Sequence, residues 1–453
     1  MILRTLIITI LLSIPVLSLA QTSITLEDAI QIALDNNYQL KQAENNLTVS
    51  DNAVLNAKAD FLPSLSASYN GTRRVGQQFD QTTVTFENVT TQSLGGNLNS
   101  SITLFNGFNN INNLRRANTN RSIQIEESQR LRENIIFTTA SRFLQVVLNE
   151  ELLKISQENL DVSEQQYEQI AAQVEVGRSP NVDLLNQASV VANEELTVIQ
   201  RENALESSYA QLMRVMQDDT GTEYSLVLPD IEDLDLMPLD LNLQDLMQTA
   251  LQNRRDLRAQ QLTIERNRYD ESIARASLLP TINASMGISG SYNDRFRSFD
   301  PELGRSVPLS YTEQFFDRNV NSFIGFNIQI PIFDNLSRRT NLENSKITLK
   351  NSQLEMENVR FQVNEEVRQA YNDYMSIVKE LESTEKALIA AERAYETEFQ
   401  RYEVGASTLI ELNQANANYV LAQSNRIQTI YNFVFQEKVL DFYLGQITES
   451  VEL

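Results

Sequence analysis

The sequence contains no histidine, no cysteine and no tryptophan among its 453 residues. Without cysteine the chain can form no disulfide, no thiolate nucleophile and no lipid anchor on an N-terminal cysteine. Without histidine as well, the common zinc sites and the histidine-dependent catalytic triads are excluded. There is no glycine-rich loop suited to phosphate binding, and no carboxylate pair stands out from the charges on helix surfaces. We therefore predict no catalytic residue, no metal, no cofactor and no enzymatic activity.

Positive charge is also scarce. The chain has 37 basic and 60 acidic residues, a formal net charge of −23. Its basic residues are scattered, whereas binding to nucleic acid requires a basic patch or stripe. We therefore expect no nucleic-acid partner.

Long apolar runs are missing except at the N-terminus. There, Arg4 precedes an apolar core from Leu6 to Leu17 and a small-residue cleavage site ending at Ala20, the pattern of a secretory signal peptide (1–20). No later stretch approaches the roughly 20 apolar residues of a transmembrane helix. We predict an exported protein in which any membrane crossing is made by β-strands.

Two halves of the chain are similar in sequence. "LEDAIQIALDNNYQL" from Leu26 aligns with "LQDLMQTALQNRRDL" from Leu243, and the same offset of 217 carries Pro63 to Pro280. Later segments align at an offset of 228. Each copy is far longer than a solenoid repeat, so the pattern indicates an internally duplicated domain.

Each repeat is predicted to contain an opening helix, two strands, a very long helix and a second helix. The first repeat (21–217) has an opening helix over about 26–60, strands near 63–75 and 94–106, and helices over 108–176 and 180–216. The second repeat (243–445) has strands near 280–293 and 321–333, and helices over 337–404 and 408–445. An acidic linker (218–242) joins the repeats, and a short tail (446–453) ends the chain.

The strand segments alternate between apolar and polar residues. In "FIGFNIQIPIF", for example, Ile324, Phe326 and Ile328 alternate with uncharged polar residues or glycine. Such alternation also suits a strand on a soluble core. However, a polar face of serine, threonine, asparagine, glutamine and glycine without charge favours a membrane strand between lipid and a wet lumen. Aromatic residues that could form interfacial girdles are Tyr69, Phe105, Tyr292, Phe315, Phe323 and Phe333.

The long helices carry a seven-residue apolar period, which is typical of coiled coils. In the first repeat its positions are Val146, Leu153, Leu160, Tyr167 and Val174. In the second they are Tyr374, Leu381, Leu388, Tyr395 and Tyr402. Helices of this length would extend on the order of 100 Å at about 1.5 Å per residue.

The same helix-to-helix turn is predicted twice. Gly177 and Gly405 suit the left-handed position that ends a helix. Ser179 and Ser407 would then serve as N-caps, with Pro180 as the first helical residue. Both turns therefore predict a helical hairpin.

Four membrane strands cannot form a pore alone. The smallest transmembrane barrels have about eight strands, and an open sheet edge cannot face hydrocarbon. Closure therefore needs at least two copies, and three copies would supply twelve strands. The residue pattern by itself does not choose between a dimer, a trimer and a larger ring.

The motifs "LEDAIQIALDNNYQL", "FLPSL" with "LLPTI", and the paired "VGxxxxxDLL" and "VGxxxxxEL" resemble the TolC family of outer-membrane efflux proteins. The resemblance implies a homotrimer in the outer membrane. Each chain would add four strands to a twelve-stranded barrel that is continuous with a coiled-coil α-helical barrel in the periplasm. It also implies contact with outer-membrane lipid, a periplasmic adaptor (membrane fusion) protein and an inner-membrane transporter. The hairpin tips, at Gly177, Ser179, Pro180, Gly405 and Ser407, would contact the adaptor.

The resemblance further implies a periplasmic gate. Tyr402 matches a tyrosine that bonds an aspartate on the neighbouring turn, and Asp183 matches that aspartate. Glu411 matches a constriction-ring carboxylate. Gln414 replaces a second carboxylate and Ser407 replaces an arginine, which puts the arginine link in doubt. Tyr402 suits a heptad core position equally well.

The acidic linker (218–242) is predicted to be extended and solvated. The stretch from Asp218 to Asp245 holds nine carboxylates and no basic residue. By the resemblance it belongs to an equatorial belt, either as a plain linker or as a surface for a belt-specific partner.

The function favoured by these features is a passive exit duct for substrates delivered by an inner-membrane pump and adaptor. The alternatives are the outer-membrane component of type I protein secretion, a stand-alone porin, and a secreted coiled-coil fibre. A stand-alone porin does not explain the long coiled-coil helices. A secreted fibre does not explain the uncharged amphipathic strands. The sequence does not identify the cargo or the pump class.

Overall fold

A computed structural model describes residues 22–80, 84–218, 224–227 and 236–448. The predicted signal peptide lies outside these residues, as do 219–223 and 228–235 of the acidic linker. The chain divides into two compact units. Of the described residues, the helical unit comprises 22–44, 126–218, 224–227, 236–257 and 358–448, and the sheet unit comprises 45–80, 84–125 and 258–357.

Helices account for most of the described chain. Those of the first half are α2 (Leu26–Asn36), α3 (Tyr38–Ala59), α4 (Asn109–Glu175) and α5 (Asn181–Met216). Those of the second half are α6 (Leu243–Asn253), α7 (Arg255–Ala276), α8 (Ser337–Glu403) and α9 (Leu409–Leu444). The two halves thus present the same series of helix lengths.

The prediction of one uninterrupted opening helix is wrong. The chain leaves helical geometry at Asn37 (φ −59°, ψ 116°), and its twin leaves it at Arg254 (φ −62°, ψ 128°). The Asn37 side chain then accepts hydrogen bonds from the backbone N–H groups of Gln39 (2.9 Å) and Leu40 (3.1 Å), which starts the next helix. Neither break contains proline or glycine, so the residue pattern gave no stop signal. At Asn37 the asparagine amide competes with the helical backbone instead.

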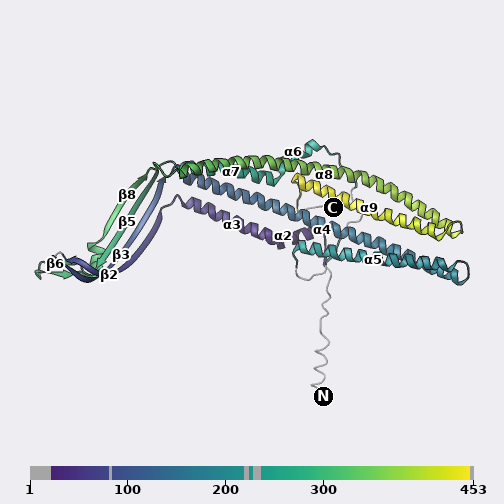
Figure 1. Ribbon diagram of the computed structural model, residues 1–453, viewed down its shortest axis with the longest axis horizontal. Coiled ribbons are helices and arrows are strands. Elements are labelled where there is room, and N and C mark those ends of the chain that lie inside the picture. The colour runs from purple at the N-terminus through teal and green to yellow at the C-terminus, as the bar shows by residue number, and fades with distance from the viewer. Residues whose placement is uncertain (1–21, 81–83, 219–223, 228–235, 449–453) are drawn as a thin grey trace, which may run out of the picture. The chain divides into compact units, whose positions relative to one another are not determined.

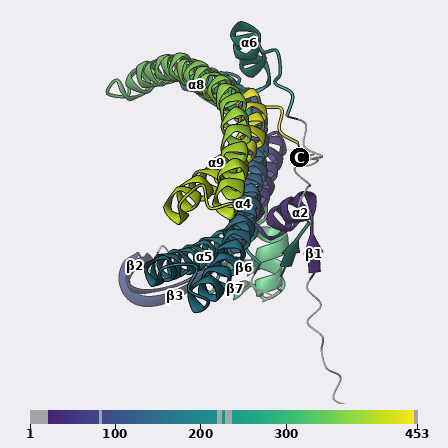
Figure 2. The same ribbon diagram turned by 90° about the vertical axis from the view of Figure 1, so that its right-hand side faces the viewer.

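In the helical unit, α4, α5, α8 and α9 lie side by side in one layer (Figure 2). The second-repeat heptad packs as predicted: Tyr374 is fully buried against Phe433, and Tyr395 stacks on Tyr419 with ring centroids 5.6 Å apart. In the first repeat the buried stripe of α4 does not follow the predicted positions beyond Val146. Three of the buried residues, Leu152, Asn159 and Gln166, lie one place before the predicted ones. The other three lie four residues after each of these, at Ser156, Ser163 and Ile170.

The sheet unit contains an antiparallel sheet in the order β2-β3-β5-β8 (Figure 1). Its strands are β2 (Ser64–Asp80), β3 (Thr85–Phe105), β5 (Thr281–Asn293) and β8 (Asn321–Gln329). The first pair extends well beyond its predicted ends, because the segment expected to be a loop continues the ladder as far as Asp80 opposite Thr85. The last strand ends earlier than predicted, since Pro331 has no N–H to donate to a ladder.

The two faces of this sheet differ in chemistry. Residues on one face are apolar or aromatic: Leu65, Ala67, Tyr69, Leu98, Ile102, Ile282, Ala284, Met286, Ile288, Tyr292, Ile324, Phe326 and Ile328. The opposite face carries amides and hydroxyls: Ser64, Ser66, Ser68, Asn70, Asn97, Asn99, Ser101, Thr103, Asn283, Ser285, Ser289, Ser291, Asn321, Asn327 and Gln329. Phe323 belongs to the polar face, where it lies opposite Gly287, so its expected place in an apolar girdle is wrong.

Both turns from a strand into a long helix share an unusual backbone. Gly107 and Phe108 have φ of 66°, and Asn335 and Leu336 have φ of 56° and 66°. Left-handed φ is disfavoured for bulky residues such as Phe108 and Leu336. The same costly geometry therefore occurs at equivalent places in both halves.

Five short elements were not expected from the residue pattern. The hairpin of β6 (Arg297–Asp300) and β7 (Arg305–Pro308) and the short π-helix η2 (Glu313–Arg318) lie between β5 and β8. In addition, β1 (Thr22–Ile24) pairs in parallel with β4 (Tyr224–Leu226). The linker also meets the helices at Leu239, whose N–H donates to Tyr374 Oη at 2.9 Å. The described parts of the acidic linker are therefore extended and largely exposed, as predicted, but they are tied to the helical unit at β4 and at Leu239.

Candidate functional site at the tips of the helix hairpins

The two hairpin turns have the same backbone. Gly177 has φ of 74° and Gly405 has φ of 73°, so the predicted left-handed stop is confirmed at both. The Arg178 N–H donates to Gln173 O, and the Ala406 N–H donates to Arg401 O, both at 2.8 Å. These bonds satisfy carbonyl groups that a helix end otherwise leaves without partners.

The helices that leave these turns are capped differently, and neither predicted serine is an N-cap. Thr408 is the N-cap of α9 and forms a capping box with Glu411: Glu411 N–H donates to Thr408 Oγ1 (3.3 Å), and Thr408 N–H donates to Glu411 Oε2 (3.0 Å). The N-cap of α5 is Pro180, not the predicted Ser179, and it makes no side-chain cap bond. Ser179 Oγ instead donates to Asp183 Oδ2 at 3.1 Å.

Glu411 is held at the start of α9 by several donors. Its Oε2 accepts from Thr408 N–H, from Thr408 Oγ1 at 3.1 Å and from Ser407 Oγ at 2.9 Å. The bond from the Thr408 backbone, with the hydroxyls of Ser407 and Thr408, lowers the pKa of Glu411 below its ordinary value. The group is exposed and charged, as a constriction carboxylate must be, but it also serves the capping box.

Arginine reaches the second tip from an unexpected position. Ser407 stands where the family pattern has arginine, but Arg401, in the last turn of α8, approaches the same place. Its Nη2 donates to Ala406 O at 3.2 Å, and its Nη1 pairs with Glu398 Oε2 at 2.8 Å. Ser407 Oγ also contacts the Glu398 carboxylate. The second tip therefore carries a compact cluster of charge and hydroxyl groups, whereas the first has only the Ser179–Asp183 bond.

Tyr402 and Asp183 are electrostatically coupled within one chain. Burial raises the pKa of the Tyr402 phenol, and the nearby Asp183 carboxylate raises it further. Tyr402 is half-buried, as a heptad core residue would be, so both interpretations of this residue stay open. Gln414 is exposed, and its Nε2 donates to Asn418 Oδ1 at 3.2 Å. The gate role of these residues remains a prediction.

A group of amides, of which three are buried and one (Asn413) is half-buried, joins the two hairpins, and the residue pattern did not identify it. We call Asn159, Gln187, Asn413 and Asn416 the amide cluster. Gln187 is fully buried; its Nε2 donates to Ser163 O at 3.1 Å, and its Oε1 accepts from Asn413 Nδ2 at 3.1 Å.

One helical turn away, Asn416 Nδ2 donates to Asn159 Oδ1 at 2.9 Å. Buried amides without partners are costly, so these bonds fix how α9 sits against α4 and α5. The available signal was the run of polar residues at three- and four-residue steps in α4, from Ser156 to Gln166, next to the apolar heptad.

Within the described residues, no group of three or more carboxylates could hold a metal ion. No described helix is both long enough and apolar enough to span a membrane. The arrangement at the tips offers hydrogen bonding, fixed charge and a rigid turn, which suit contact with another protein or control of an aperture.

The sequence model of the outer membrane efflux protein family matches this chain over residues 29–216 and 246–446. Among curated relatives, the outer membrane efflux protein BepC of Brucella suis is 22% identical over 434 residues, which are 95% of this chain and 87% of BepC.

Solved structures show the same fold. A crystal structure of CusC has a TM-score of 0.79 at 19% identity and covers 93% of this chain and 92% of CusC. The CmeC outer membrane channel of Campylobacter jejuni has a TM-score of 0.79 at 17% identity, over 94% of this chain and 87% of CmeC.

Proposed function

The chain belongs to the outer membrane efflux protein family, and we propose a specific architecture for the channel that it forms. It is located in the outer membrane and acts there as the exit duct of a tripartite efflux system, with its helical part in the periplasm. Its role is transport rather than catalysis. The proposal concerns how many copies make the duct, and which residues meet its partners.

Three copies form a twelve-stranded barrel. The observation that carries this proposal is the four-stranded sheet, which has one apolar face, one uncharged polar face, and β2 and β8 at its edges. An open edge in hydrocarbon leaves backbone groups without hydrogen bonds, each at a cost of several kcal/mol. Joining β8 of one copy to β2 of the next removes every edge and turns the polar face toward a water-filled lumen.

The periplasmic part is a ring of twelve helices, four from each copy. The long helix α4 begins four residues after β3 ends, so strand and helix are closely linked in the chain. The heptad residues from Leu381 to Tyr402 are only half-buried in one chain, which leaves apolar surface for a neighbouring copy.

An internal duplication underlies this symmetry. It is supported by the two separate matches to the family model and by the repeated pairs of left-handed residues at the strand-to-helix turns. Two similar halves place pseudo-equivalent hairpins around the ring, so three chains approximate a six-fold arrangement.

The partners are a periplasmic adaptor protein and an inner-membrane pump. The tips at Gly177, Ser179, Pro180, Gly405 and Ser407 contact the adaptor, because they form the turns at the ends of the hairpins, where Gly177, Pro180 and Gly405 are exposed and the two serines are half-buried. An outer-membrane role in type I protein secretion is the alternative, and a stand-alone porin is the weaker one.

The decisive experiment is fractionation of cells followed by light scattering of the detergent-extracted protein. We expect an outer-membrane particle of three chains, about 155 kDa from 51.6 kDa per chain including the signal peptide. A deletion strain should lose resistance to some toxic compounds and regain it with the wild-type gene. A water-soluble single subunit would contradict the barrel.

A further inference from the structure

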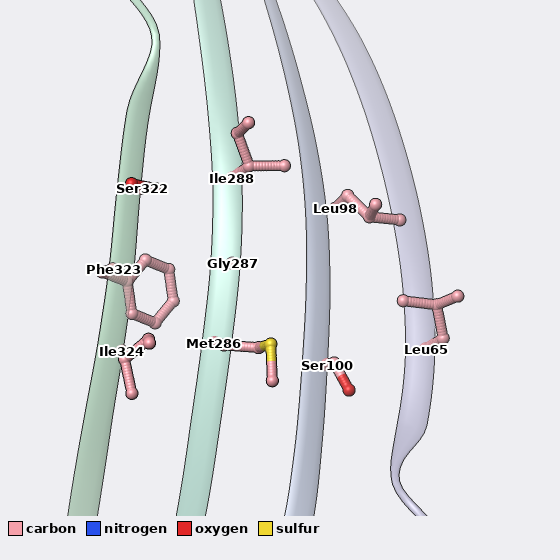
Figure 3. A pocket seen from close by; sticks show the side chains of 9 residues that line it. All are labelled: Leu65, Leu98, Ser100, Met286, Gly287, Ile288, Ser322, Phe323 and Ile324. Carbon is pink, nitrogen blue, oxygen red and sulfur yellow. The ribbon is translucent and has the colours of Figure 1, made fainter.

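A groove runs along the apolar face of the sheet. It consists of two cavities that share Leu98 and Ile288, one of about 540 Å³ and one of about 310 Å³. We call the two together the strand groove. Figure 3 shows the larger cavity, where side chains of Leu65, Leu98, Met286, Ile288 and Ile324 lie along four adjacent strands. No charged side chain lines either cavity.

The π-helix η2 forms a wall at one end of the strand groove. Phe315 lies directly over two glycines of the apolar face. A Cβ on Gly290 would come within 2.3 Å of the Phe315 carbonyl oxygen, and a Cβ on Gly96 within 2.6 Å of its ring. A larger residue at Gly290 would push the η2 backbone away from the sheet, whereas one at Gly96 would displace the Phe315 ring.

Hydrogen bonds fix this wall. Gln314 is fully buried; its Oε1 accepts from Asn293 N–H and its Nε2 donates to Leu309 O, both at 3.0 Å. Asn319 Nδ2 donates to Ser291 O at 3.0 Å. The segment is therefore bound to the sheet by specific polar contacts and is not simply collapsed onto an apolar surface.

Aromatic residues surround the wall. Phe315 lies 5.1 Å from Tyr311, 5.0 Å from Phe316 and 6.1 Å from Tyr69, measured between ring centroids. Tyrosine is enriched at the headgroup level of membranes, because its ring is apolar while its hydroxyl group can stay hydrated. The wall thus marks the headgroup end, and the lining becomes aliphatic toward Met286.

The dimensions fit a single leaflet. Gly290 and Met286 are four residues apart on β5, about 13 Å along the strand at roughly 3.3 Å per residue. With a strand tilt of about 40° this is about 10 Å along the membrane normal, which fits within one leaflet. Half of the hydrocarbon core, which is about 30 Å thick, is about 15 Å.

We propose that the strand groove holds one acyl chain of an outer-leaflet lipid, with η2 as its wall at the headgroup level. The inference rests on the proposed barrel, which turns this face toward lipid. A hydrocarbon chain is the occupant that matches the lining, because the only polar side chains in the larger cavity are the hydroxyls of Ser100 and Ser322. The smaller cavity is lined mainly by aromatic, aliphatic and glycine residues, and its polar residues are Ser68, Asn97 and Ser289, none of them charged.

The test uses the full-length protein reconstituted in phosphatidylcholine vesicles that contain two photoreactive phosphatidylcholines. One carries a diazirine at the end of an acyl chain, and the other carries it near the ester. After illumination, adducts are mapped by peptide mass spectrometry. We expect the chain-end probe to concentrate on Met286 and Leu98, and the near-ester probe on Tyr69 and Phe315.

The variant Ser100→Phe fills the groove and should reduce the chain-end adducts at Met286 by about five-fold, because the apolar contact area is lost. Ala284→Phe adds a similar ring on the same face outside both cavities, and should leave these adducts unchanged. A second variant, Gly290→Ala, displaces Phe315 and should reduce the near-ester adducts at Tyr69. Each variant is first checked for assembly by light scattering.

The outcomes separate the two proposals. Adducts spread evenly over the apolar face, and equal in Ser100→Phe and wild type, would refute the groove but leave the barrel intact. If Ser100→Phe does not assemble, Gly290→Ala and the positions of the adducts in wild type decide the question. An absence of adducts on this whole face would refute the barrel as well.

Discussion

The two hairpin tips share a backbone but not a chemistry. Both turns use a left-handed glycine and the same main-chain hydrogen bonds. The second tip adds a capping box, an arginine, and hydroxyl groups between two carboxylates, while the first has one serine–aspartate bond and a proline N-cap without a side-chain bond. The repeated turn geometry is what a hairpin requires, whereas the side chains around it are free to differ. We infer that the second tip is the more rigid one.

The largest effect is expected at the amide cluster, which joins the two hairpins. Gln187→Ala removes the partner of Asn413 and of the Ser163 carbonyl in a fully buried place. Leaving a buried polar group without a partner costs about 1–3 kcal/mol, so the free energy of unfolding should fall by an amount of that order. Denaturant unfolding followed by helical circular dichroism measures it.

The matched control is Gln414→Ala, an exposed amide on α9 close to the same tip. It should stay within about 0.5 kcal/mol of wild type, since an exposed substitution loses little. Equal losses in the two variants would show that the amide cluster does not stabilise the contact between hairpins.

The next effect tests the difference between the tips directly. Thr408→Ala removes the capping box of α9 and should cost about 1 kcal/mol locally. The hydrogen-exchange rate of the Glu411 amide should then rise by roughly five-fold. Ser179→Ala, which removes the hydroxyl next to the N-cap of the first tip, should raise exchange of the Asp183 amide by less than about two-fold, because Ser179 accepts no cap bond from a backbone N–H. Similar effects at both tips would contradict a more rigid second tip.

A smaller effect is expected from the proposed gate. Tyr402→Phe combined with Asp183→Ala removes the coupling between the half-buried phenol and the carboxylate. If this pair helps to hold the aperture closed, single-channel conductance in a planar bilayer should rise. A link worth up to about 1 kcal/mol corresponds to a change of up to about five-fold in the open population.

Tyr395→Phe is the control for loss of a phenol on the same heptad. It should leave conductance near the wild-type value. Unchanged conductance in the double variant would assign Tyr402 to the helix core alone and would leave the fold unaffected.

The smallest effect is a pH dependence confined to the second tip. Hydrogen bonds from Thr408 and Ser407 lower the pKa of Glu411 below its ordinary value of 4.5. A lowered folded-state pKa stabilises the tip above pH 4.5, and this contribution is lost as the pH falls through the folded-state value. Exchange of the Thr408 amide should therefore accelerate below about pH 4.5 beyond its intrinsic change.

In Glu411→Gln this extra acceleration should disappear. The Asp183 amide at the first tip supplies the internal reference. An identical acid response in wild type and Glu411→Gln would show that the capping carboxylate does not carry the effect.

Much of the fold could be predicted because it depends on local or periodic features. The long helices end within one or two residues of their predicted limits, since Gly177 and Gly405 act through their own backbone conformation. The strands begin beside Pro63 and Pro280, which cannot continue the preceding helices. The alternation of apolar and polar residues likewise assigned the two faces of the sheet, except at Phe323, where the ring fits over Gly287 on the polar side.

The candidate site was predicted less well. The N-cap was assigned to Ser407 instead of its neighbour Thr408, because several hydroxyl residues in a row compete for one backbone position. Arg401 was missed at the tip, since the family pattern places arginine elsewhere. The buried stripe of α4 was displaced by one residue, because polar residues occupy it and only packing against α5 and α9 buries them.

The sequence by itself determined that the protein is exported, that it contains paired helical hairpins and four amphipathic strands, and that it lacks the residues for thiol, histidine or zinc chemistry. These features depend on composition, period and backbone restraints that act over a few residues. Only the tertiary structure decided which polar groups become buried partners, such as Gln187 with Asn413, and that η2 folds onto Gly96 and Gly290. Those outcomes depend on contacts between segments far apart in the chain, and no local pattern specifies which of many possible partners will meet.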